Sequence, residues 1–557
     1  MLWAIVVMGL TLTAGPAPTA TTGSRSIGET QPATSAISSE IRARLTRKPD
    51  WRLANRDLNR LYDAAQPAPF WVDHAGRPSH VAHEGLALLA GAAGEGLDPE
   101  DYDAAGLGRR AAALEAAQSR GPEEVAAFDV ALSAALLRYF RHLHLGRVDP
   151  RTIGFRVRMP DDRHDFVPLL RAAVQRDRIA AAVADLAPAL VQYRALRAAL
   201  SRYRTVGSAG IPVIPSTTAS VRPGEPHPHL ATLIRQLRAL GDLPADLPVP
   251  AETDIYQGAV VTAVERFQLR HGLTPDGILG RATQAALRVP LSWRIRQIEL
   301  ALERLRWLPD LGRQRFIVLN IPMFTLWGWD SIPPTGAPSF GMRAIVGRAH
   351  HTRTPVFVDE MQHVIFRPYW NVPRSILRNE ILPVLARDPG YLRRNEMEMV
   401  RGQGDDARVE ADTAENRALL TQGVLRLRQR PGPRNSLGPI KFVFPNDFDV
   451  YMHGTPAQAL FAHSRRDFSH GCVRVEDPAA LAAWVLKEEP AWNQERILAA
   501  MSGATSQRVD LTSPIQVILY YVTAVVMPED GTLHFAEDIY GHDLRLDRAL
   551  TRAATGP

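Results

Sequence analysis

The sequence is poor in cysteine and lysine, and it lacks the local motifs of common cofactor sites. Its 557 residues include one cysteine, Cys472, and three lysines, so the net charge of +6 comes almost entirely from arginine. No dense Lys/Arg run occurs, which disfavours nucleic acid and leaves anionic lipid or an acidic polymer as the partners that a basic chain attracts. The motifs C-x-x-C, H-E-x-x-H, G-x-x-x-x-G-K and G-x-G-x-x-G are missing as well, so we expect neither a metal nor an organic cofactor.

The bulk composition is that of a folded protein with several domains. Apolar residues make up 45% and charged residues 22% of the chain, which is typical of globular domains. At about 150 residues per domain, the length indicates three or four units. After the first residues, no apolar run is long enough to cross a bilayer.

The N-terminus indicates export. Residues 1–22, within "MLWAIVVMGLTLTAGPAPTATTGS", begin with an apolar stretch that is followed by small residues and proline. This pattern predicts a signal peptide, with an uncleaved anchor as the alternative, because basic residues before the apolar stretch and a clear cleavage site are both missing. Residues 23–40 are rich in Ala, Thr, Ser and Gly and predict a mobile linker.

Helical periodicity dominates the first half of the chain. Residues 41–205 predict a helical domain in which Val125, Phe128, Leu132 and further apolar residues recur every three or four positions. A segment rich in Pro, Gly and Ser, 206–227, predicts a linker. Residues 228–290 predict a small unit of helices, and 291–309 predict an amphipathic helix that completes the helical domain.

The period then changes to that of strands. Short β-branched and aromatic segments such as "RFIVLNIP", "MRAIVGR" and "IKFVFP" predict a mostly β domain over 313–545. Between about 374 and 432 the sequence is polar and helical again, which predicts an inserted helical lid. The expected fold class is therefore multi-domain α+β.

The single cysteine lies in "FSHGCVRVEDP". A leftover thiol in an exported protein needs a reason, because that compartment favours disulfides. Alternation in "CVRV" directs Cys472 and Arg474 to one face of a strand and the two valines to the core. Asp477 and Pro478 are typical of a helix start, so the thiol is expected at the beginning of a short strand near the surface.

A neighbouring imidazole makes a thiol a good nucleophile by taking its proton. His453, in "YMHGTP", can reach Cys472 only if their strands are neighbours, and His470 is close in sequence. Backbone N–H groups around Gly471 and Cys472 could form an oxyanion hole. Each residue alone also has a structural interpretation: a buried small thiol, a structural or surface histidine, or an arginine that pairs with Glu476 or with solvent. Together they favour a cysteine nucleophile with a histidine base.

These residues resemble a known family. "MHG", the sixteen residues from Thr455 to His470, and then "GC" within "SHGCVR" closely match the catalytic signature of the L,D-transpeptidases, with a YkuD-type catalytic domain. The resemblance extends to "PYWNVP" and "GPRNSLGPIKFVFPN", and "ERFQLRHGLTPDGILGRATQAAL" is similar to a small helical peptidoglycan-binding domain. The layout resembles the large branch of the family, with a helical scaffold, a peptidoglycan-binding domain over 228–290, and a catalytic domain with a capping insertion.

The resemblance implies roles for individual residues. Cys472 is expected to be the nucleophile, His453 its general base, and the Gly454 carbonyl the group that orients the imidazole. His470 and Gly471 are expected to shape the site or its oxyanion hole. The expected substrate-binding residues are Tyr451, Trp370, Asn371, Ser469 and Arg474.

The resemblance also implies a function in the periplasm. The expected reaction joins the third residues of two peptidoglycan stem peptides through a thioacyl enzyme and releases D-alanine. An L,D-carboxypeptidase that hydrolyses the same bond, or a catalytically silent wall-binding scaffold, stays open as an alternative. Expected partners are stem peptides, glycan strands and peptidoglycan synthases, with no nucleic acid, and the chain is expected to be a monomer.

Overall fold

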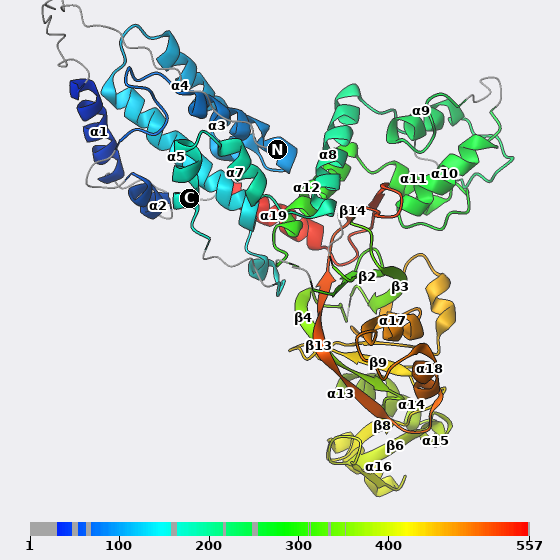
Figure 1. Cartoon of the computed structure of the whole chain (residues 1–557). Helices are drawn as coiled ribbons and strands as arrows, with labels where there is room; N and C mark the ends of the chain where they lie inside the picture. The colour runs from blue at the N-terminus through cyan, green and yellow to red at the C-terminus, as the bar shows by residue number, and fades with distance from the viewer. Residues whose placement is uncertain are drawn as a thin grey trace, which may run out of the picture.

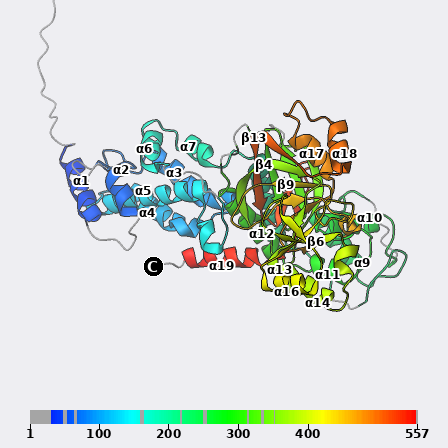
Figure 2. The same ribbon diagram turned by 90° about the horizontal axis from the view of Figure 1, so that it is seen from below.

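The computed structural model describes residues 31–46, 54–62, 68–157, 164–215, 219–247, 254–309, 311, 314–331, 336–350 and 352–554. Three bodies meet at a central junction: an elongated helical body, a small helical body and a β-rich body with an insertion at its far end (Figure 1). The view from below places the first helical body and the β-rich body at opposite ends (Figure 2). The predicted signal peptide, 1–22, lies outside the described residues.

The first body is built around one long helix, α5 (Pro122–Leu145). Its apolar stripe of Val125, Phe128 and Leu132 is fully buried, as the periodicity predicted. Gly146 ends the helix at φ 81°. The other helices are α1 (Gln31–Thr46), α2 (Ala54–Leu61), α3 (His80–Ala90), α4 (Ala104–Ala116), α6 (Phe166–Gln175) and α7 (Ile179–Leu186).

The predicted linker 23–40 is wrong in its second half. Residues from Gln31 onward form α1, which packs on α5 with Ile37 and Ile41 buried in the core of this body. Alanine, serine and threonine in this segment resemble a tether in composition. Two isoleucines four residues apart nevertheless give one face of a helix enough apolar surface to bury.

Two helices that pack against each other, α8 (Val191–Ala209) and α12 (Leu291–Leu305), form the junction between the bodies. Their shared core includes Leu196, Ile298 and Leu302 together with Phe316 and Tyr520 from the β-rich body. The helix predicted over 291–309 thus joins the helical part to the sheet. In the described part of the chain, no single helix has the length and apolar character needed to cross a membrane, and α7 and α8 meet that test only as a pair bent by 112°.

The small body holds α9 (Leu230–Leu240), α10 (Ala259–Arg270) and α11 (Arg281–Leu287). Val260, Val264 and Phe267 form the buried face of α10, as predicted. The described part of the predicted linker 206–227 is mostly irregular, but α8 continues to Ala209 and Ile214 is buried in the core of the small body. Backbone bridges from 221 and 226 to this body replace the side-chain packing that the Pro- and Gly-rich sequence cannot provide.

The β-rich body is a sheet that closes on itself. The nine strands run in the order β11-β3-β12-β10-β9-β4-β13-β1-β2, and β2 also pairs with β3. The strands are β1 (Phe316–Asn320), β2 (Thr325–Trp329), β3 (Phe340–Gly347), β4 (Phe357–Phe366), β9 (Ile440–Val443), β10 (Met452–His453), β11 (Asp467–Ser469), β12 (Val473–Val475) and β13 (Gln507–Tyr520). Helices α17 (Pro478–Val485), α18 (Gln494–Ser502) and α19 (His542–Ala554) and the hairpin β14 (Ala524–Val526) and β15 (Leu533–Phe535) complete it.

Strand β1 and the C-terminal stretch of β13 that pairs with it are largely buried on both faces. Ile317 and Leu319 point into the core of the closed sheet, whereas Phe316 and Val318 face the junction helices. The partner strand divides in the same way, with Leu519 inside and Tyr520 outside. Helices cover the outer face, so the paired stretch of these parallel strands carries mostly apolar side chains, with Gln516 and Asn320 as exceptions.

The predicted helical lid is wrong in part. The insertion contains a four-stranded sheet in the order β5-β8-β6-β7. Its strands are β5 (Trp370–Asn371), β6 (Met397–Arg401), β7 (Arg408–Glu410) and β8 (Arg426–Gln429), and its helical segments are α13 (Arg374–Ile376), η4 (Leu377–Ile381), α14 (Leu382–Leu385), α15 (Tyr391–Arg394) and α16 (Ala414–Gln422). "MEMV" and "LRLRQ" alternate apolar and polar residues, which fits a half-buried strand.

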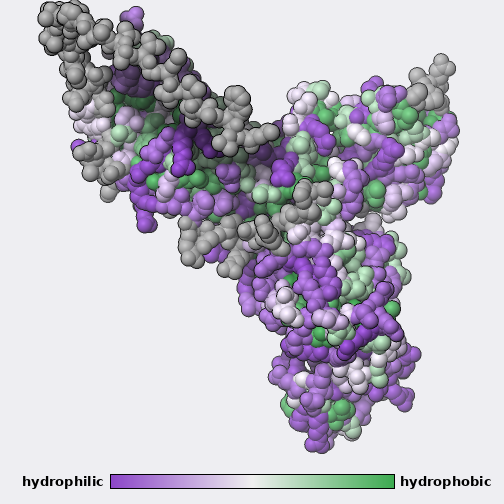
Figure 3. Space-filling view, viewed as in Figure 1, coloured by the Kyte–Doolittle hydropathy of each residue, from purple (hydrophilic) through white to green (hydrophobic). Residues whose placement is uncertain are grey.

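The visible surface is mostly hydrophilic, with hydrophobic residues in small scattered groups (Figure 3). The large apolar side chains that are most exposed, Leu269, Val409 and Val213, lie on three different parts of the chain. Apolar residues that are scattered singly in this way are normal on a folded protein.

Candidate active site

Three neighbouring strands bring the predicted site residues together. Strand β10 lies between β9 and β12, with His453 directly opposite Lys441 on one side and Arg474 on the other. Residues that are directly opposite point to the same face of a sheet. Met452 and Val473 point the other way and are fully buried. The alternation predicted for "CVRV" is therefore confirmed.

His453 is a buried, neutral imidazole. Its exposed fraction is 4%, and its Nδ1 hydrogen-bonds the Gly454 carbonyl oxygen at 2.5 Å. A carbonyl only accepts, so Nδ1 carries the proton and Nε2 is the basic nitrogen of the neutral ring. Burial, and then the charge of Arg474, lower the pKa of His453 to about 3. At neutral pH this ring is a base that holds no second proton.

A glycine in the neighbouring turn allows this arrangement. Gly438 has φ 65°, and a Cβ added there would lie 2.6 Å from the Thr455 nitrogen and 2.7 Å from the Gly454 carbonyl carbon. Real Cβ atoms do not approach that closely, so only glycine lets the turn before β9 pack against the Gly454 peptide. The turn thereby fixes the carbonyl that orients the imidazole.

The Cys472 sulfur is partly exposed and protonated. It lies 3.8 Å from the Asp449 carbonyl oxygen, to which the thiol donates. Burial raises the pKa of Cys472 above its ordinary value, and the Tyr451 hydroxyl, which hydrogen-bonds the sulfur, partly opposes this shift. The thiol, not the thiolate, is therefore the resting state of Cys472. Among the described residues, no hydrogen bond joins the sulfur to His453.

Two cations flank the pair. The Lys441 ammonium lies 3.8 Å from the centre of the Tyr451 ring, and its charge favours the Cys472 thiolate. Burial lowers the pKa of Arg474, and its buried Nε has no hydrogen-bond partner in the part of the chain that the structure describes. The alternative pairing with Glu476 is wrong, because Glu476 forms its ion pair with Arg343. A guanidinium without an anion is suited to bind a carboxylate ligand.

The turn before the cysteine is held by hydroxyl groups. Ser469 Oγ donates to the Cys472 carbonyl oxygen at 2.5 Å and accepts from the Gly471 N–H at 3.1 Å. Gly471 has φ 113°, a conformation that favours glycine. Thr354 donates to the Gly471 carbonyl oxygen at 2.8 Å. Because the Gly471 N–H is already engaged, it is poorly placed to serve an oxyanion.

The remaining predicted residues contact or belong to the capping insertion. His470 Nε2 lies 2.5 Å from Glu380 Oε1 on η4, so its side chain meets the insertion. Trp370 and Asn371 form β5 and pair with Gln429 and Arg428 of β8. Among the described residues, no ring contact or hydrogen bond links these two residues to the cysteine.

Sequence reasoning missed three residues of this site: Lys441, Asp449 and Glu380. Lys441 could have been noticed as one of three lysines in an arginine-rich chain, within a strand-like "IKFV". Asp449 contributes its backbone carbonyl oxygen, and its φ is 53°. A pattern of side chains in the sequence does not predict a backbone contact of this kind. Glu380 approaches His470 from 90 residues away.

The arrangement defines a class of site. The site combines a partly exposed thiol, a neutral buried imidazole and a guanidinium that has no ion pair among the described residues. This is a cysteine–histidine site of the kind used in acyl transfer. Within the described residues, no group of three or more metal-ligating side chains is found.

Comparisons with known proteins assign the domains. Residues 314–501 match the model of the "L,D-transpeptidase catalytic domain", residues 227–287 that of a "Putative peptidoglycan binding domain", and residues 56–200 that of a "Scaffold domain". A relative from Haemophilus influenzae, described as "Putative L,D-transpeptidase", is 31% identical over 256 residues, which is 45% of this chain and 49% of that protein. The chain thus spans about half the length of the curated relative that it matches.

The β-rich body is therefore an L,D-transpeptidase catalytic domain of the YkuD family, in one chain with a scaffold domain and a peptidoglycan-binding domain. The expected family and the multi-domain α+β fold are confirmed. Domains that act on peptidoglycan imply a location at the cell wall or in the periplasm.

Proposed function

We propose that the protein is a peptidoglycan L,D-transpeptidase that uses Cys472 to join the third residues of two stem peptides. The observation that carries this function is the neutral His453, aligned by Gly454 on the strand next to the one that Cys472 begins. The peptidoglycan-binding domain supports the choice of polymer. Stem peptides, glycan strands and peptidoglycan synthases are the proposed partners, and the proposed protein is monomeric and exported.

The first half-reaction is an acyl transfer to sulfur. His453 Nε2 takes the thiol proton as Cys472 Sγ attacks the carbonyl carbon between the third residue and the terminal D-alanine of a tetrapeptide stem. The Cys472 N–H is assigned to the developing oxyanion, because Gly471 donates to Ser469. The protonated imidazole returns its proton to the leaving amine, D-alanine departs, and a thioester remains.

The second half-reaction reverses these roles. The side-chain amine of a second stem loses a proton to His453 and attacks the thioester carbonyl. The carbon–sulfur bond breaks, the thiol regains its proton, and a new amide joins the two third residues. We assign a stem carboxylate to Arg474, and the walls of the pocket to Tyr451, Trp370 and Asn371. The capping insertion is proposed to keep water from the thioester.

Defined muropeptides test this function. Purified full-length protein is incubated with disaccharide tetrapeptides, and the products are weighed by mass spectrometry. We expect a dimer that has lost one D-alanine, at least about 10⁴-fold less of it with Cys472→Ala, and about 10²- to 10⁴-fold less with His453→Gln. Tripeptide alone would assign the protein to the carboxypeptidases instead. A wall-binding scaffold would be indicated if the substrate stays unchanged and Cys472→Ala does not affect binding to sacculi.

A further inference from the structure

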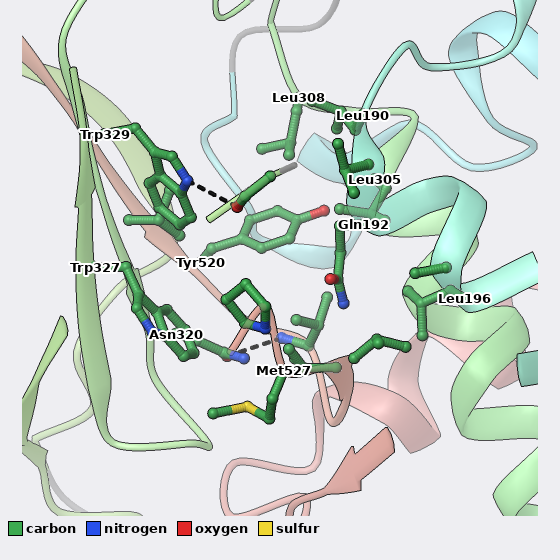
Figure 4. A pocket seen from close by; sticks show the side chains of 18 of the residues that line it. Leu190, Gln192, Leu196, Leu305, Leu308, Asn320, Trp327, Trp329, Tyr520 and Met527 are labelled. Carbon is green, nitrogen blue, oxygen red and sulfur yellow. Dashed lines mark hydrogen bonds between the residues drawn. The ribbon is translucent and has the colours of Figure 1, made fainter. Parts of the chain in front are cut away.

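A second pocket lies away from the cysteine, at the junction of the scaffold helices and the catalytic sheet. Its volume is about 270 Å³. Side chains from α8, α12, β1, β2 and the segment around β14 surround it (Figure 4). Protein interiors hold few voids larger than a water molecule, whereas ligand pockets start at about this size. The pocket is therefore a candidate binding site.

The lining is almost entirely apolar. Leu196 and Leu305 come from the two helices, Trp327 and Trp329 from β2, and Val525 from β14. None of the described residues that line the pocket is charged. Two of the polar side chains are already satisfied: the Gln192 amide pairs with the Val526 backbone at 2.9 and 2.8 Å in the orientation that suits both atoms, and Trp329 Nε1 donates to the Gly336 carbonyl oxygen at 3.1 Å.

Two buried donors without an acceptor line this apolar pocket. Tyr520 and Asn320 are each 2% exposed, and the Tyr520 hydroxyl and Asn320 Nδ2 have no hydrogen-bond partner among the described residues. Asn320 Oδ1 is occupied, because it accepts from the Val522 N–H at 3.3 Å. Burial raises the pKa of Tyr520 well above its ordinary value, so its hydroxyl keeps its proton. Such donors are costly to leave unpaired.

The sheet places both donors on one wall of the pocket. Asn320 ends β1, Tyr520 ends β13, and the two residues are directly opposite each other in the parallel register. Neighbouring strands are about 4.8 Å apart, and both side chains lie on the outer face toward the helices. A carbonyl oxygen in the pocket can accept from the Tyr520 hydroxyl. A carboxylate fits less well than a neutral carbonyl, because the described lining residues include no cation to neutralise it.

We propose that this pocket binds one acyl chain whose head is an uncharged carbonyl, as in an ester or amide of a fatty acid. The chain fills the space between the helices and β2, and its carbonyl oxygen accepts from the Tyr520 hydroxyl. The site is separate from the proposed transpeptidase reaction. Its occupant contacts the scaffold and the catalytic domain at once, so binding also stabilises the junction.

Calorimetric titration of delipidated full-length protein tests the site. The probes are monodecanoylglycerol, decanoate at pH 8 and decane. We expect one equivalent of the ester to bind about tenfold more tightly than decane or decanoate. Tyr520→Phe removes the hydroxyl and keeps the ring, so it should weaken ester binding about five- to tenfold and leave decane binding unchanged. Tyr391→Phe, in the capping insertion, is the matched control and should change neither affinity.

Two further variants and a vesicle experiment complete the test. Leu196→Trp fills the pocket and should abolish binding of all three probes. If this variant does not fold, Ala195→Leu is used in its place. Sedimentation with phosphatidylcholine vesicles distinguishes the source of the chain: retention of the wild type but not of the filled variant assigns a membrane lipid, and ester binding without retention assigns a free one. Absence of ester binding, or equal loss of ester and decane with Tyr520→Phe, would overturn the proposal.

Discussion

At the scale of single residues, the site keeps its reactive pair uncharged. His453 lies between Lys441 and Arg474 on the neighbouring strands, and both cations disfavour a protonated imidazole. The same cations favour a thiolate, but burial outweighs them and raises the pKa of Cys472. The resting state is thus thiol and imidazole, and the charges form only when a carbonyl is attacked.

The pH dependence of alkylation follows from this state. Iodoacetamide reacts with thiolate, so the rate at Cys472 should keep rising with pH to above 9, where an ordinary thiol begins to level off. A preformed thiolate–imidazolium pair would instead give a plateau near neutral pH. The rate is measured by stopping the alkylation at set times and weighing the intact protein by mass spectrometry. A plateau below pH 8 would contradict a resting thiol.

Lys441 offers a second test at this scale. Lys441→Met removes a charge that favours the Cys472 thiolate, so the thiol pKa should rise further and alkylation at pH 8 should slow by about three- to tenfold. Lys487→Met is a matched control, because Lys487 pairs with Asp330 elsewhere in the domain. Equal alkylation rates in the two variants would show that Lys441 does not influence the Cys472 thiol.

At the scale of elements, the capping insertion is a small unit with its own core. Leu377, Ile381 and Leu392 pack with Met399 and Leu427 inside it. Its η4 segment is a π-helix, a rare form that is frequent at functional sites. Glu380 on η4 meets His470, two residues before the cysteine, so the insertion is tied to the loop that carries the nucleophile.

Weakening this tie should change the fate of the thioester rather than its formation. Glu380→Gln removes the negative charge that faces His470, so the insertion should open more often and admit water. We expect the ratio of tripeptide to cross-linked dimer to rise about two- to tenfold, with loss of D-alanine little changed. Glu415→Gln on α16 is the control. A ratio unaffected by Glu380→Gln would show that this contact does not shield the intermediate.

At the scale of the whole molecule, buried neutral histidines are spread over all the bodies. Burial lowers the pKa of His142, His453 and His542 to about 3 and that of His534 to about 4. The pKa of His271, in the peptidoglycan-binding domain, is also well below its ordinary value. Each of these rings takes up a proton at a higher pH when the chain unfolds.

These histidines predict a steep loss of stability in acid. Between pH 6.5 and the folded pKa values the unfolded state binds more protons, so the free energy of unfolding should fall by about 1.4 kcal/mol per histidine for each pH unit of acidification. Asp129, whose pKa burial raises to about 6, opposes this by one proton between about pH 6 and 4. Urea unfolding at pH 7.5, 6 and 5 measures the trend. A midpoint that is constant with pH would contradict this trend.

Local sequence determined the short-range features. Val473 and Val475 alternate with Arg474 and fix which face of β12 is buried, and Asp477 caps α17 through its own side chain. The stripe on α5 and the family signature around Cys472 were also readable, because each depends on residues only a few positions apart. Composition gave wrong predictions where it conflicts with the local apolar pattern. It predicted a linker where α1 forms, and helices where the capping insertion has strands.

The tertiary structure alone decided what surrounds these features. The order β9-β10-β12 places Lys441 beside His453, and the pairing of β2 with β3 closes the sheet. The contact between Glu380 and His470, the neutral state of the thiol and imidazole, and the two unpaired donors of Tyr520 and Asn320 likewise depend on packing between distant segments. A backbone conformation is chosen by neighbours along the chain, whereas burial, strand pairing and electrostatic environment are set by residues that meet only when the chain has folded.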